Sequence, residues 1–133
     1  MPASFHSKTI MVSRFIVFPV LLALTALPAS ASDLVDSYTA RLSRDDHFNT
    51  SGVRLRSAAA IIRQDRANFH KFGQIDREDT FDSVFGSVSN RSKLEKMLDN
   101  GSTSESARRA IVNGTPLIKI NIYRNSVDVL VIE

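Results

Sequence analysis

The chain has 133 residues, with 17 basic side chains against 14 acidic ones, and it contains no cysteine. The lack of cysteine excludes disulfides, thiol catalysis, cysteine metal sites and lipid attachment through a cysteine. The length suits one folded domain with one core. No cofactor is predicted, because the chain has neither a glycine-rich loop after a strand nor a Gly-x-Ser-x-Gly elbow.

The first predicted element is a cleaved secretory signal over residues 1–31. Lys8 and Arg14 precede an apolar run over residues 15–27, and Ala29-Ser30-Ala31 supplies a small-residue exit. About thirteen apolar residues in a helix span roughly 20 Å, which is short of the ~30 Å hydrocarbon core and therefore disfavours a membrane anchor. Cleavage is expected after Ala31, and either Met1 or Met11 fits as the first residue.

The residues after the signal predict one nearly neutral domain over residues 32–133. Removing Lys8 and Arg14 from the 17 basic residues leaves 15 against 14 acidic ones, which argues against nucleic acid as a partner. The lack of cysteine in an exported chain favours a periplasmic or secreted protein of bacterial type. No stable membrane anchor is expected once the signal is removed.

The first half of this domain predicts a strand and then a long helix. Alternation over residues 37–43 predicts a half-buried strand whose inner face carries Tyr38, Ala40 and Leu42. A period of 3.6 over residues 54–71 predicts a helix that ends before Gly73. Its inner stripe is Leu55, Ala58, Ala59, Ile61, Ile62 and Phe69, and its predicted solvent side is Arg56, Arg63, Gln64, Arg66 and Asn68.

Residues 74–88 are acidic and are predicted to form a solvated loop, with a helical turn pinned to the core by Phe81, Val84 and Phe85. The spacing of Leu94, Met97 and Leu98 predicts a helix over residues 90–99, which Asn100-Gly101 ends. A further helix is expected to begin at a capping box over residues 102–105 and to end at Asn113-Gly114.

The C-terminal residues predict a β-hairpin. A two-residue loop at Asn125-Ser126 would pair Ile122 with Val129 and Ile120 with Val131. Leu130 and Ile132 make the last strand apolar on both faces, which predicts that it is either central, beside the strand at residues 37–43, or covered by a helix. The expected fold is α+β, a small antiparallel sheet packed by about three helices in the order β-α-α-α-β-β, with an uncovered sheet edge as a possible docking surface.

Two groups of side chains are candidates for a functional site. His47 and His70 with Asp65 could form an acid/base or metal site if the fold brings them together, although no metal-ligand spacing supports this and ordinary surface histidines are favoured. Arg63, Asp65 and Arg66 are rich in hydrogen-bonding groups and could recognise a carboxylate, a glycan or a protein. A solvated helix face is the favoured alternative for them.

The chain also resembles a group of small exported hypothetical proteins of Gram-negative bacteria. The resemblance rests on residues 38–43, 46–49, 58–70 and 111–116, and it implies export without transferring any functional residue. The favoured function is non-enzymatic binding of an envelope protein or glycan, because the sequence has few convergent catalytic groups and no cofactor motif, and predicts a free sheet edge and a polar helix face. Two alternatives stay open: a small hydrolase or metal-dependent enzyme using His47 and His70, and an inhibitor of an envelope enzyme that presents residues 74–88.

Overall fold

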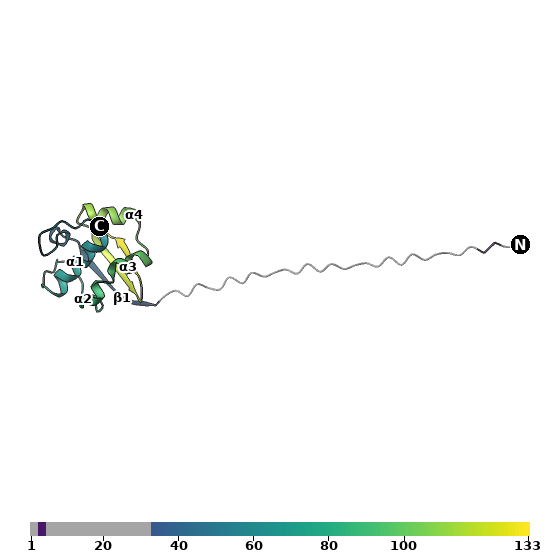
Figure 1. Cartoon of the computed structure of the whole chain (residues 1–133), viewed down its shortest axis with the longest axis horizontal. Coiled ribbons are helices and arrows are strands. Elements are labelled where there is room, and N and C mark those ends of the chain that lie inside the picture. Colours follow the sequence, from purple (N-terminus) through teal and green to yellow (C-terminus); the bar gives the residue numbers. More distant parts are fainter. Residues whose placement is uncertain (1–2, 5–32) are drawn as a thin grey trace. The chain divides into compact units, whose positions relative to one another are not determined.

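A computed structural model describes residues 3–4 and 33–133, so the predicted signal over residues 1–31 lies almost entirely outside the described residues. In chain order the elements are β1 (Leu34–Arg41), the 3-10 helix η1 (Arg44–His47), α1 (Ala58–His70), α2 (Val88–Arg91), α3 (Leu94–Asn100), α4 (Glu105–Asn113), β2 (Leu117–Tyr123) and β3 (Val127–Val131) (Figure 1). The predicted α+β class and the predicted order of strands and helices are confirmed. No helix in the described part of the chain is both long and apolar enough to cross a membrane.

The three strands form an antiparallel sheet in the order β1-β2-β3. The prediction that the last strand is central is therefore wrong, because β2 lies in the middle and β3 is an edge strand. Leu130 and Ile132, which suggested a covered strand, are each 54% exposed. An apolar residue on the uncovered face of an edge strand cannot be told from a buried one by its pattern alone.

The hairpin register differs from the predicted one by two residues. Ile122 lies opposite Val127 and Ile120 lies opposite Val129. The Tyr123 N–H donates to the Ser126 carbonyl at 2.8 Å, which leaves Arg124 and Asn125 as the two-residue loop. The inner face is still the predicted one, since a shift of two residues preserves the alternation of a strand.

Helices α1, α3 and α4 contribute to one hydrophobic core on one face of the sheet. The strands supply β-branched and aromatic side chains to this core, and the helices cover them with aliphatic ones. The fully buried strand residues are Ala40, Ile118, Ile120 and Val127, with Leu42 directly after β1, and those from the helices and the segments between them are Ile61, Ile62, Phe85, Leu94 and Ile111. The core lies wholly within residues 38–129, so residues 33–133 form a self-contained domain.

Irregular segments bond to part of each edge of the sheet. Beside β1, the Thr80 N–H donates to the Thr39 carbonyl (2.9 Å), and Asp79 accepts from the Arg41 N–H (2.9 Å). Beside β3, the Val129 N–H donates to the Ser102 carbonyl at 3.0 Å. The expectation of an uncovered sheet edge is therefore wrong at these positions.

Several helix boundaries also differ from the predicted ones. Helix α1 begins after Ser57, whose side chain caps the Ala60 N–H. The helix predicted over residues 90–99 is divided into α2 and α3. The N-cap of α4 is Ser104, which accepts from the Ala107 N–H at 3.1 Å, so the capping box predicted from Ser102 is wrong. Residues 81–85 form no helix.

Candidate functional site

The solvent face predicted for α1 is only partly exposed. Arg63 is exposed, but Asp65 is 2% exposed and Arg66 is fully buried. Asp65 and Arg66 follow Ile61 and Ile62 by four residues and so continue the same buried stripe of the helix. The prediction that Arg66 lies on the solvent side is therefore wrong, and a partner can meet only Arg63 of the three candidate binding residues on the surface.

An irregular segment, residues 74–87, packs against α1, and we call it the strap. Arg66 joins α1 to this strap. Its guanidinium lies between two aromatic rings, with Cζ 4.0 Å from the centroid of Tyr38 and 4.5 Å from that of Phe69. Its Nε donates to Asp65 at 2.8 Å, and its Nη1 donates to Asp82 at 3.0 Å and to the Thr80 carbonyl at 3.3 Å.

Asp82 is the anionic partner of Arg66. It is fully buried and also accepts from His70 Nε2 at 2.7 Å and from the backbone N–H of Phe85 at 2.6 Å. Burial alone would raise the pKa of Asp82, but the hydrogen bonds from Phe85, His70 and Arg66 outweigh burial and hold the pKa below its usual range. The prediction of a solvated acidic loop is therefore wrong for Asp82.

Asp65 carries the second carboxyl group on the same guanidinium. Burial raises its pKa to about 8, against the opposing attraction of Arg66. One buried cation thus faces one ionised carboxylate, Asp82, and one carboxyl that stays protonated near neutral pH. This division of charge avoids a buried excess of negative charge, which would be costly in a medium of low polarity.

A separate polar cluster joins α1 to η1. Asp46 accepts from the side-chain amide of Asn68 at 2.8 Å and from the Ser43 N–H at 2.8 Å, and burial raises its pKa. The imidazole of His47 lies between two carbonyl oxygens, those of Ser43 and Ile111, at 2.8 Å from each. These contacts tie η1 to both α1 and α4.

The described contacts do not join the two candidate histidines, and the favoured expectation of ordinary surface histidines is wrong for His47, which is 2% exposed. His47 and His70 share no hydrogen-bond partner, and neither bonds to Asp65. Within residues 33–133 no group of three histidine, aspartate or glutamate side chains could hold a metal ion. The buried charged groups have little access to any solute, so their contacts serve to fasten the strap and η1 to α1.

The exposed side of α1 carries two adjoining grooves. The polar groove, of about 570 Å³, lies between η1 and α1 and is lined by Arg44, Asp45, Phe48, Asn49, Thr50, Gln64, Asn68, Phe72 and Gln74. The apolar groove, of about 240 Å³, lies between α1 and α2 and is lined by Thr50, Arg63, Gln64, Ala67, Lys71, Phe72, Val88, Arg91 and Ser92. Thr50, Gln64 and Phe72 line both, and we call the surface that they join the α1 face.

The α1 face is positively charged. Arg44, Arg63 and Lys71 are exposed and form no ion pair within the described domain. Asp45 is the only acidic residue in the lining of either groove. Sequence reasoning found Arg63 but missed the other cations, because they come from η1, the end of α1 and α2, which only the fold brings together.

No family model matches the chain, and comparison with curated proteins and with solved structures found no match. A functional assignment therefore rests on the residues and geometry of this chain.

Proposed function

We propose that the protein is a small exported binding protein that acts, without catalysis, by engaging a partner protein in the periplasm or cell envelope. The observation that carries this proposal is the α1 face, where exposed cations without carboxylate partners surround two exposed apolar side chains, Phe72 and Val88. Exposed apolar groups rimmed by charge are typical of protein interaction sites. The signal pattern over residues 1–31 supports the proposed location.

Affinity capture from a periplasmic extract tests the proposal. The bait is the domain over residues 32–133, compared with its Arg63→Glu variant and with Arg109→Glu as a matched control. Arg109 is an exposed arginine of α4, whose ion pair with Glu105 is itself exposed and so contributes little to stability. All three baits should give the same circular dichroism spectrum.

We expect one set of proteins to be retained by the wild type and by Arg109→Glu and to be lost with Arg63→Glu. Retention that is unaffected by Arg63→Glu would remove the α1 face as the binding surface. If the wild-type bait retains nothing that a blank column does not, the proposal of a binding protein fails.

The strap supports a second candidate, an inhibitor or regulator of an envelope enzyme. The strap is held in place by hydrogen bonds that the Ser83 N–H donates to Asp36 and the Thr39 N–H donates to the Thr80 hydroxyl, while Phe81 remains exposed. A rigid loop with an exposed aromatic side chain is suited to enter an enzyme's cleft. Phe81→Ser should then relieve inhibition of a captured enzyme, whereas unchanged inhibition would dismiss this role for the strap.

A further inference from the structure

We infer that the α1 face receives an acidic, extended peptide segment of the partner, with one apolar side chain of that segment between Phe72 and Val88. This inference rests on the proposed function and adds the chemistry of what is bound. It follows from three properties of the face: its continuity, its uncompensated positive charge and the position of its apolar side chains.

The two grooves form one path across α1. They share Thr50, Gln64 and Phe72, so a chain leaving the polar groove passes directly into the apolar one. The polar groove offers side-chain amides from Gln64 and Gln74, which can hydrogen-bond the peptide groups of an extended segment. The path therefore suits a strand-like ligand better than a compact one.

The apolar groove has an uncompensated positive charge. Arg63, Lys71 and Arg91 line it, and no acidic residue does. Arg91 is only 6% exposed, and its Nη1 donates to the carbonyl oxygens of Phe85 and Gly86 (2.9 and 3.0 Å). Those carbonyl groups are neutral, so the buried charge has no counter-ion within the described domain. A buried cation of this kind favours an incoming carboxylate.

The apolar side chains of the α1 face indicate that the acidic residues of the bound peptide flank an apolar residue. Phe72 is 44% exposed and Val88 is 75% exposed, and they line the apolar groove together with Ala67. The Lys71 ammonium lies 5.2 Å from the centroid of the Phe72 ring. An apolar side chain held there would be surrounded by the cations, which is the arrangement of an anchor residue within a charged rim.

A protein ligand fits this face better than a nucleic acid does. Without Lys8 and Arg14 the chain carries 15 basic residues against 14 acidic ones, which is far from the general excess of positive charge that phosphate backbones require. Within the apolar groove the positive charge lies at three positions, Arg63, Lys71 and Arg91. A peptide with acidic side chains on either side of an apolar one complements this arrangement of cations around an apolar groove.

The test uses three synthetic peptides and the isotope-labelled domain over residues 32–133. The first peptide alternates Asp and Glu around a central Phe, the second replaces that Phe by Ser, and the third replaces every acidic residue by Lys. Fluorescence anisotropy gives the affinities, and amide chemical shifts identify the surface that each peptide contacts.

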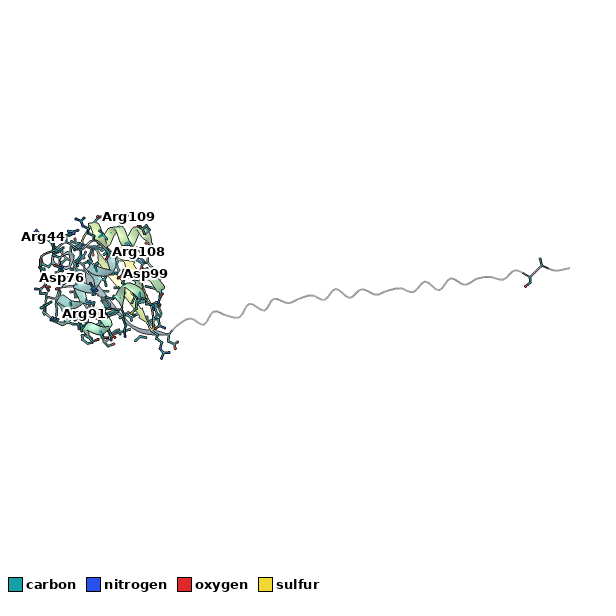
Figure 2. All side chains as sticks on the ribbon, in the orientation of Figure 1. Arg44, Asp76, Arg91, Asp99, Arg108 and Arg109 are labelled. Atoms are coloured by element: carbon teal, nitrogen blue, oxygen red, sulfur yellow. The ribbon has the colours of Figure 1, made fainter. Side chains whose placement is uncertain are left out.

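We expect the Phe-containing acidic peptide to bind, with shifts confined to α1, α2 and η1, and added salt should weaken it because the charges are exposed. Arg63→Glu and Lys71→Glu should each weaken it at least about tenfold. Arg109→Glu should leave the binding unchanged. This control cation lies on α4 at the top of the domain in Figure 2, whereas Arg44 lies at its upper left and Arg91 at its lower left. Phe72→Ser should weaken the Phe-containing peptide more than the Ser-containing one.

Several results would overturn the inference. Equal binding of the acidic and basic peptides, shifts outside the α1 face, or indifference to Arg63→Glu and Lys71→Glu would each do so. An oligothymidylate that binds as tightly as the acidic peptide would point instead to a nucleic acid, and concentration-dependent self-association lost with Lys71→Glu would point to a second copy of the chain. If affinity capture depends on Arg63 but no acidic peptide binds, the proposed function stands and this inference alone fails.

Discussion

Replacing Arg66 by methionine tests whether the buried ion cluster holds the domain together. Methionine is close to arginine in length but has neither charge nor hydrogen-bond donors. The exchange removes the donors to Asp65, Asp82 and the Thr80 carbonyl. Asp65 tolerates the loss because burial raises its pKa to about 8 and keeps it protonated. Asp82 keeps its bonds from His70 and Phe85 but loses the guanidinium as its partner.

The expected cost follows from the isolation of Asp82. Removing one partner from a buried ion pair typically costs about 3–5 kcal/mol, because the remaining charge is left without compensation. Domains of this size are stable by only about 5–15 kcal/mol, so the variant would lose a large part of its stability. At ~4–8 °C per kcal/mol, the midpoint of thermal unfolding should fall by at least about 12 °C.

Urea unfolding followed by far-ultraviolet circular dichroism measures this loss. The matched control is Arg63→Met, which makes the same exchange at an exposed position of the same helix and should change stability by no more than about 0.5 kcal/mol. If Arg66→Met lowers the free energy of unfolding by less than about 1 kcal/mol, with an unchanged urea dependence, the reasoning from buried charge is refuted.

Three further changes test other parts of the structure. The pKa of Asp65 is about 8 in the folded chain and near 4 when unfolded, so the folded state holds the extra proton and stability falls as pH rises from about 4 to about 8. Urea titrations across this range should show a smaller loss of stability for Asp65→Asn than for the wild type. Equal losses would contradict the assignment of the raised pKa to Asp65. A Cβ at Gly101 would overlap the Val127 carbonyl, whereas one at Gly86 would lie 3.8 Å from His70 Nδ1, an ordinary contact. Gly101→Ala should therefore cost about 1–3 kcal/mol or more and Gly86→Ala much less in thermal unfolding; equal costs would mean that the β3 edge moves freely. Ser104→Ala should cost about 1 kcal/mol by removing the cap of α4. Ser102→Ala should cost little, because Ser102 contacts β3 through its backbone. A larger loss of stability for Ser102→Ala than for Ser104→Ala would show that Ser102 is the capping residue.

Much of the fold is predictable from periodicity, and the errors arise where periodicity carries no information. Alternation identifies the face on which Tyr38, Ile120 and Val129 lie, and all three are buried. It cannot tell which residue lies opposite which, so the hairpin register can shift by two without changing a face. Nor can it show whether an apolar outer residue such as Leu130 is covered.

The candidate site is less predictable, although one signal was present in the sequence. Asp65 and Arg66 lie four residues beyond Ile61 and Ile62, so the helical period alone indicates that they are buried. Their partner Asp82 belongs to the strap, whose path over α1 depends on tertiary structure. The same holds for the α1 face, because η1, α1 and α2 are brought together only by packing.

The pairing of β1 with β2 also constrains how the protein folds. Arg41 lies opposite Leu117, so the whole helical part of the chain separates two strands that must meet before the sheet exists. Closing so long a loop costs entropy before any core contact offsets it, and such topologies fold slowly. The N-terminal strand has no partner in the sheet until the C-terminal hairpin has been synthesised. A chain with a predicted export signal would thus remain unfolded, and able to pass through a narrow channel, until its last residues are available.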